Sequence, residues 1–109
     1  MEKVFTPWQK GVLLICQKCH KAIDPKSLSS EANSAEVLRD YLRKELAQQQ
    51  AGKGIRVMVS GCLNVCKAQK QAIVYAAVHE AEPGQGTTEA YTIHPEQDRE
   101  QVLEFLKQK

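Results

Sequence analysis

Four cysteines stand in two close pairs, and this spacing constrains the fold more than any other feature of the sequence. The pairs are Cys16 with Cys19 and Cys62 with Cys66. Each pair follows a strongly apolar run, residues 11–15 and 55–59, of the kind that forms a buried strand. If the two strand ends meet, four thiolates converge on one point. Four converging thiolates are the ligand set of a tetrahedral Zn(II) site or of an iron-sulfur cluster.

The length and composition predict one ordinary globular domain. The chain has 109 residues, of which 42% are hydrophobic and 26% are charged, so composition alone selects no special class. No run approaches the roughly 18 apolar residues of a membrane-spanning helix, and the N-terminal region lacks the pattern of an export signal. We therefore expect a cytoplasmic protein without membrane contact. In that reducing compartment, close cysteine pairs favour metal binding or redox chemistry over structural disulfides; four unrelated core thiols are the alternative.

The hydrophobic pattern predicts four strands and two helices. The expected strands are residues 11–16, 55–60, 71–78 and 89–94, and the expected helices are residues 35–50 and a C-terminal helix that begins at Pro95. The resulting order is βαβββα, an α/β arrangement in which a βαβ unit precedes a hairpin and a terminal helix. This is the layout of a single thioredoxin-like domain. We expect residues 1–10 to form an N-terminal arm and residues 11–109 to form the domain.

Local signals set the expected boundaries of these elements. Asn33 or Ser34 is expected to cap the first helix, and glycines at positions 52 and 54 to end it. The polar segment 21–34 is expected to be a loop, and residues 82–87 are expected to form the hairpin turn. Pro95 suits the first position of the last helix, because a proline there loses no helical hydrogen bond.

The net charge of +2 is unevenly distributed along the chain. Residues 1–78 contain 12 Lys and Arg against 6 Asp and Glu, whereas residues 79–109 contain 3 against 7. Lysines flank both cysteine pairs, at positions 18, 21, 67 and 70. An electropositive surface around the thiols would attract acidic partner proteins; a solvated basic face without a partner is the alternative. The basic density and aromatic pattern of a nucleic-acid groove are missing from the sequence, so no nucleic-acid binding is expected.

Several kinds of thiol chemistry compete for these residues. Four thiolates can hold a 2Fe-2S cluster, two on each iron, or a single structural zinc ion. The 42 residues between Cys19 and Cys62 argue against zinc, because zinc-binding pairs are usually closer together in the sequence. A dithiol oxidoreductase would use Cys16 and Cys19 alone and leave Cys62 and Cys66 unexplained.

His20 adds two further alternatives to the four-thiolate site. Together with the first cysteine pair it spells the C-x-x-C-H motif of covalent haem attachment, although haem attachment belongs to exported proteins. His20 could also replace Cys19 as a cluster ligand, which would raise the reduction potential. Its other interpretations are an exposed basic residue or a hydrogen-bond donor beside the site.

The succession of motifs resembles the thioredoxin-like 2Fe-2S ferredoxin family. The resemblance covers residues 12–107, and its sharpest parts are residues 59–66, 72–75 and 91–96, which read VSGCLNVC, AIVY and YTIHPE. The closely spaced C-x2-C and C-x3-C pairs also resemble a branch of predicted metal-binding proteins with the same fold. The family usually separates its first two ligands by ten or more residues, whereas here only two residues lie between Cys16 and Cys19. The short loop leaves open whether four thiolates hold two irons or one ion.

The resemblance implies a function for residues 11–109 as a thioredoxin-like iron-sulfur domain. Cys62 and Cys66 match the second ligand pair of the family, Cys16 matches the first ligand, and Cys19 takes the remaining position. The implied protein is a small electron carrier with a 2Fe-2S cluster, not an enzyme, which exchanges electrons with an acidic redox partner. Members of the family often pair as homodimers. The alternative of another class is a zinc-binding structural or metal-delivery module of the same fold.

Overall fold

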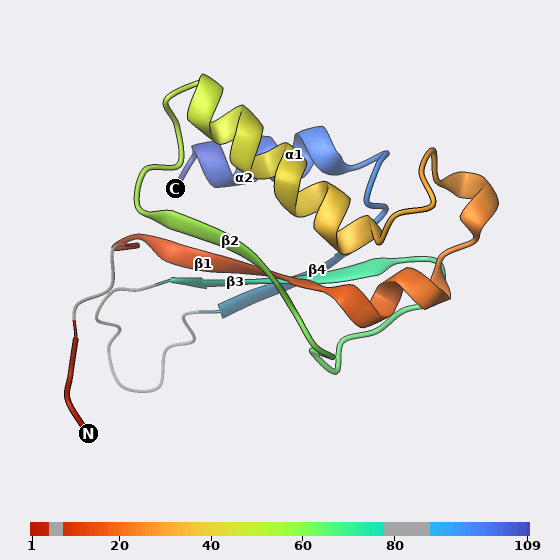
Figure 1. The fold of residues 1–109 in the computed structure, drawn as a ribbon, viewed down its shortest axis with the longest axis horizontal. Coiled ribbons are helices and arrows are strands. Elements are labelled where there is room, and N and C mark those ends of the chain that lie inside the picture. Colours follow the sequence, from red (N-terminus) through yellow and green to blue (C-terminus); the bar gives the residue numbers. More distant parts are fainter. Residues whose placement is uncertain (5–7, 78–87) are drawn as a thin grey trace.

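A computed structural model describes residues 1–4, 8–77 and 88–109 and consists of one mixed sheet with two α-helices (Figure 1). The strands are β1 (Gly11–Cys16), β2 (Ile55–Ser60), β3 (Gln71–Ala77) and β4 (Thr88–Ile93). The helices are α1 (Ser34–Gln48) and α2 (Arg99–Lys107), and two short 3-10 helices, η1 (Gln17–Ala22) and η2 (Pro25–Ser27), follow β1. The predicted α/β class and the predicted order βαβββα are therefore confirmed.

The sheet has the strand order β2-β1-β3-β4. Strands β1 and β2 are parallel, with Gly11 opposite Ile55 and Cys16 opposite Ser60. Strand β3 runs antiparallel to both β1 and β4. Because β1 and β2 run in the same direction, the chain leaves both strands at the same edge of the sheet, and each cysteine pair lies at or just past that edge.

The two helices cover one face of the sheet (Figure 1). Alternate strand residues, such as Leu13, Ile15, Val57 and Ile73, point to this face and pack with the apolar stripes of both helices in one core. Cys16 belongs to the other alternation, with Val12 and Leu14, and packs in a separate small cluster with Cys19 and Ala72. The thiols of the first pair therefore lie outside the main core.

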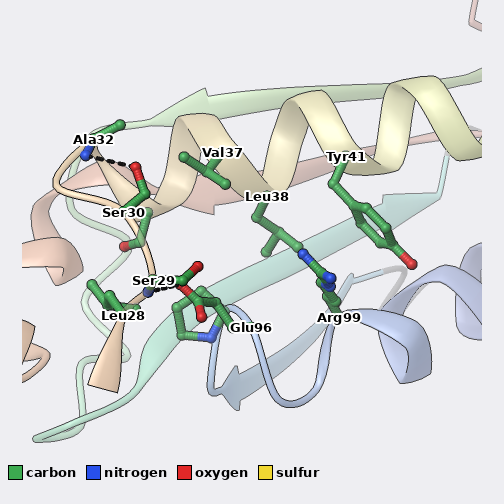
Figure 2. Close-up of a pocket in the computed structure, with 11 residues that line it drawn as sticks. Leu28, Ser29, Ser30, Ala32, Val37, Leu38, Tyr41, Glu96 and Arg99 are labelled. Carbon is green, nitrogen blue, oxygen red and sulfur yellow. Dashed lines mark hydrogen bonds between the residues drawn. The ribbon is translucent and has the colours of Figure 1, made fainter. Parts of the chain in front are cut away.

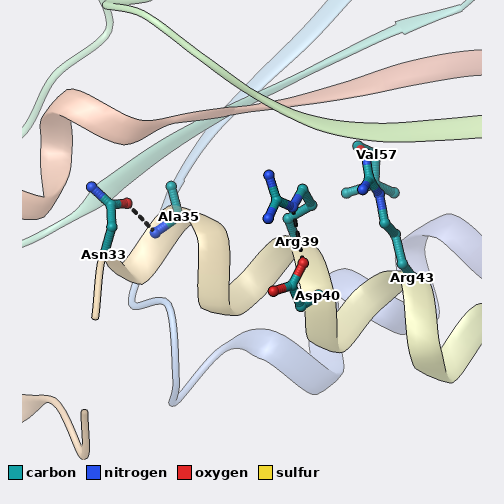
Figure 3. Close-up of polar contacts among 6 residues, drawn as sticks. All are labelled: Asn33, Ala35, Arg39, Asp40, Arg43 and Val57. Atoms are coloured by element: carbon teal, nitrogen blue, oxygen red, sulfur yellow. Dashed lines mark hydrogen bonds and ion pairs between the residues drawn. The ribbon is translucent and has the colours of Figure 1, made fainter. Parts of the chain in front are cut away.

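Helix α1 is capped and held to the sheet by side-chain hydrogen bonds (Figure 3). The side chain of Asn33 accepts a hydrogen bond from the Ala35 N–H at 3.0 Å, which confirms the predicted cap. Arg43 donates from Nε to the Val57 carbonyl at 2.9 Å and so ties the helix to β2. The helix ends at Gln48, before the glycines expected to stop it, because Gln50 already takes a left-handed conformation with φ 51°.

The prediction that Pro95 begins the last helix is wrong. Residues 95–98 form a turn, and α2 begins at Arg99. The turn is closed by the buried ring of His94, whose Nδ1 accepts hydrogen bonds from the N–H groups of Glu96 and Gln97, while Asp98 accepts from the His94 N–H at 2.7 Å. Side chains thus satisfy the N–H groups that a helix starting at Pro95 would have left free.

Other predicted boundaries hold with small shifts. The expected loop 21–34 contains the end of η1 and all of η2. The described part of the third strand reaches Ala77, one residue short of its predicted end. The fourth strand ends one residue before its predicted position, and its described part begins at Thr88, one residue before its predicted start. Val78 and the expected turn 82–87 lie outside the described residues.

Replacement of Gly11 by alanine is expected to lower the free energy of unfolding by about 1–3 kcal/mol. A Cβ at this position would lie 2.5 Å from the Tyr75 hydroxyl and 2.8 Å from the Ala76 carbonyl oxygen, which the antiparallel pairing of β1 with β3 fixes. Gly61→Ala is the matched control, since a Cβ there meets no atom within 4 Å. Urea unfolding in reducing buffer measures both variants, and equal stability of the two would contradict the strand register.

Candidate metal centre

The topology brings both cysteine pairs to one edge of the sheet. Cys16 is the last residue of β1 and lies opposite Ser60, the last residue of β2. Cys19 lies in η1, directly after β1, and Cys62 follows the end of β2 by two residues. Hydrogen bonds between the connecting segments hold them together: the Gln69 N–H donates to the Ala22 carbonyl at 3.0 Å.

The first pair is buried. The side chain of Cys16 is fully buried and that of Cys19 is 3% exposed. Burial raises the pKa of the Cys19 thiol to about 11, although the backbone N–H of Ala72 acts in the opposite direction. Burial also raises the pKa of Cys16, but hydrogen bonds from the Cys19 thiol and from the backbone N–H groups of Cys19, Lys18 and Leu63 outweigh it, so that this pKa is lowered. Cys16 is the thiol whose ionised form the fold stabilises.

The second pair is exposed and closely spaced. Both Cys62 and Cys66 are exposed, and their sulfur atoms lie 3.9 Å apart. The N–H of Asn64, a residue with φ 59°, points to the Cys62 sulfur at 3.4 Å. The neighbouring thiol of Cys62 raises the pKa of Cys66, and this effect exceeds the opposite effect of the Cys19 thiol.

The two pairs contact each other. Leu63, which lies between Cys62 and Cys66, packs on the cluster formed by Cys16, Cys19 and Ala72. This contact and the parallel pairing of β1 with β2 place the two cysteine-bearing segments next to each other.

A sulfur separation of 3.9 Å fits two ligands of one metal ion. With a metal-to-sulfur distance of about 2.3 Å, two thiolates on a tetrahedral ion lie about 3.8 Å apart. Backbone N–H groups directed at cysteine sulfurs also suit a metal-thiolate site, because they stabilise sulfur in its charged form. The donor set, four sulfurs from two chain segments, is therefore compatible with zinc and with iron.

The thiols do not form a ready-made coordination sphere. In the ranges 1–4, 8–77 and 88–109, no group of three or more His, Cys, Asp or Glu side chains is arranged to hold a metal ion. The sulfurs of Cys62 and Cys66 have the spacing of hydrogen-bonded, protonated thiols. Thiols that bind a metal must lose these protons, so the metal-free arrangement differs from the liganded one. Rotation of a cysteine side chain about χ1 moves its sulfur by about 3 Å, which is enough to change a hydrogen-bonded cluster into a ligand set.

The side chain of His20 is turned toward helix α1. Its Nδ1 accepts a hydrogen bond from the Ser34 N–H at 3.0 Å and lies 3.1 Å from the Ser34 hydroxyl oxygen. Cys19, by contrast, lies in the buried cluster with Cys16. Nδ1 of His20 therefore already has a partner on α1, whereas Cys19 lies beside Cys16.

Sequence reasoning missed Gln71, which is fully buried beside the thiols. Its Nε2 donates to the Cys16 carbonyl at 2.7 Å, and its Oε1 accepts from the Ser34 hydroxyl at 3.0 Å. The only signal in the sequence is a polar residue at the start of an otherwise apolar strand. At Gly61, directly before Cys62, the structure shows neither a positive φ nor a neighbour that would exclude a side chain.

A small cavity lies away from the four thiols, between the start of α1 and the turn before α2 (Figure 2). Its volume is about 30 Å³, which is room for about one water molecule. Glu96 accepts hydrogen bonds from the N–H and the hydroxyl of Ser29 there, and Arg99 stacks on the ring of Tyr41. These side chains already have partners, so the cavity is a packing feature that joins the loop after η2 to the last helix.

Comparisons of the chain with protein-family models, with curated proteins and with solved structures found no match. The family suggested by the resemblance therefore stays a prediction. None of the helices in the described part of the chain is long and apolar enough to cross a membrane.

The unequal burial of the two pairs predicts unequal reactivity in the metal-free, reduced protein. Iodoacetamide is expected to modify Cys62 and Cys66 at least about 10-fold faster than Cys16 and Cys19, because the buried thiols react only after local opening. The low pKa of Cys16 does not compensate, since the reagent must reach the sulfur. Peptide mass spectrometry over time measures each site, and unfolding in guanidinium should equalise the rates. Rapid modification of Cys16 in the folded protein would contradict its burial.

Proposed function

We propose that Cys16, Cys19, Cys62 and Cys66 hold a 2Fe-2S cluster and that the protein is a small electron carrier. The observation that supports this most is the position of both cysteine pairs at one sheet edge, where Leu63 of the second segment packs on the cluster of Cys16, Cys19 and Ala72. A 2Fe-2S cluster needs two thiolates on each iron, and the chain supplies one pair from each of two segments. When bound, the cluster would supply reversible one-electron chemistry.

The unequal burial of the pairs suits electron transfer. The buried Cys16 and Cys19 would anchor one side of the cluster, and the exposed Cys62 and Cys66 would hold the other side at the surface. An electron can then pass to a docked protein without a substrate pocket. The proposal accordingly assigns no catalytic acid, base or nucleophile to the chain, and a reducing compartment such as the cytoplasm would keep free thiols available for the cluster.

The proposed partner is an acidic redox protein. Lys18 and Lys67 are exposed next to the two pairs, and Lys70 is half-buried at the turn before β3. Complementary charges speed association and lose strength as salt screens them. Neither nucleic acid nor a membrane enters the proposal. The homodimer implied by the resemblance remains a prediction for size-exclusion chromatography.

A single zinc ion in a structural or metal-delivery module is the second candidate. One observation favours it, the 3.9 Å between the sulfurs of Cys62 and Cys66. This separation suits two ligands of one tetrahedral ion. Zinc has no accessible redox change, so the two candidates differ in colour, magnetism and function.

The metal content of protein purified without oxygen tests the proposal. We expect two irons and two acid-labile sulfides per chain, a brown colour with visible charge-transfer bands, and an EPR signal after one-electron reduction. A colourless protein with one tightly bound zinc ion would replace the first candidate by the second. Protein without a stoichiometric metal of either kind would reject both.

Single Cys→Ser variants test the ligand set. Each of the four substitutions is expected to abolish or strongly reduce cluster retention, because a serine oxygen is a poor ligand for these irons. His20→Ala serves as the control and should retain the cluster with an unchanged visible spectrum. Retention of a normal cluster by Cys19→Ser together with its loss in His20→Ala would identify His20 as the ligand instead.

A further inference from the structure

The metal centre described above leaves one buried polar network unexplained. It consists of Gln71 at the start of β3, Ser34 at the start of α1 and His20 in η1. Gln71 is fully buried, and Ser34 is 5% exposed. Polar side chains are rarely this buried unless hydrogen bonds satisfy them, and the cost of leaving such groups unpaired is high.

The hydrogen bonds of Gln71 are specific to its amide. Nε2 donates to the Cys16 carbonyl at 2.7 Å, whereas Oε1 accepts from the Ser34 hydroxyl at 3.0 Å. One group must donate and the other must accept, so no apolar residue and no carboxylate of similar size reproduces both bonds. The register of β1 with β3 ends at Ile15 and Ile73, so the amide acts on Cys16 just beyond the paired residues.

The Cys16 carbonyl that accepts this bond lies directly before η1, and η1 carries Cys19. A fixed carbonyl restrains the first turn of η1, and with it the position of Cys19 relative to Cys16. The network also includes the residue after Cys19, because the ring of His20 accepts a hydrogen bond from the Ser34 N–H at 3.0 Å.

We propose that Gln71 is a positioning residue for the thiol centre. Its amide fixes the Cys16 carbonyl at the start of η1, so that the first cysteine pair keeps one geometry whether or not a metal is bound. The expected effect of Gln71 on metal binding rests on the proposed function. The restraint that Gln71 places on Cys16 applies to the metal-free chain as well.

Two substitutions separate the hydrogen bonds of Gln71. Gln71→Glu keeps the length of the side chain and an acceptor for Ser34, but it faces the Cys16 carbonyl with an oxygen in place of a donor. Ser34→Ala removes the other bond and leaves the donor to Cys16 in place. Val102→Ala is the control for general destabilisation, because Val102 is 4% exposed in the main core and does not belong to the cluster of Cys16, Cys19 and Ala72.

The probe is Co(II), whose visible bands report the number and geometry of thiolate ligands. In the full-length protein loaded with Co(II), we expect Gln71→Glu to shift these bands and to speed metal release to a chelator by about 10- to 100-fold. Ser34→Ala and Val102→Ala should keep the wild-type bands and should release Co(II) within about threefold of the wild-type rate, even where urea unfolding shows a loss of stability. Bands and release rates of Gln71→Glu that match those of Val102→Ala would overturn the proposal.

The metal-free protein supplies a readout that does not depend on the proposed function. Gln71→Glu is expected to raise the alkylation rate of Cys16 by iodoacetamide at least about 10-fold over wild type, while Val102→Ala changes it by less than about threefold. If wild-type protein shows no thiolate bands with Co(II), the proposed metal centre fails and this rate alone decides the role of Gln71. An unchanged Cys16 rate in Gln71→Glu would then overturn the positioning role.

Discussion

Parallel pairing of β1 with β2 is the constraint on which the rest of the site depends. It places Cys16 opposite Ser60 and makes the chain leave both strands at the same edge of the sheet. Cysteines separated by 42 residues in the sequence thereby become neighbours. An antiparallel arrangement of the same two strands would place the pairs at opposite edges, and the four sulfurs could not share a metal.

The surroundings of the sulfurs differ between the two pairs in a way that suits a half-exposed metal centre. Cys16 and Cys19 pack with Ala72 and Leu63 in a cluster separate from the main core. Cys62 and Cys66 are exposed in the segment after β2. One pair is thus fixed by packing and the other is accessible from solvent, which is a favourable combination for admitting a metal and then holding it. The buried amide of Gln71 adds a directional restraint to the fixed pair.

The fold was predictable from the sequence because its elements carry strong local signals. The apolar runs before each cysteine pair gave strands β1 and β2 with their observed bounds, and the cap at Asn33 was visible as a residue type. The start of α2 was not predictable from Pro95, since it depends on His94 and Asp98 side chains that hydrogen-bond the intervening backbone. The role of Gln71 was hidden for a similar reason: its two partners, Cys16 and Ser34, are distant in the sequence. Backbone N–H groups that face sulfur cannot be predicted from residue type, because every residue except proline carries one.

X-ray absorption at the edge of whichever metal the purified protein carries tests the central claim most directly, because it counts the sulfur neighbours of that metal without assuming which metal it is. The account predicts a first shell made only of sulfur at about 2.3 Å: four thiolates on zinc, or two thiolates and two sulfides on each of two irons. A first shell that contains nitrogen or oxygen in place of one or more thiolates would contradict the claim that all four cysteines bind one inorganic centre.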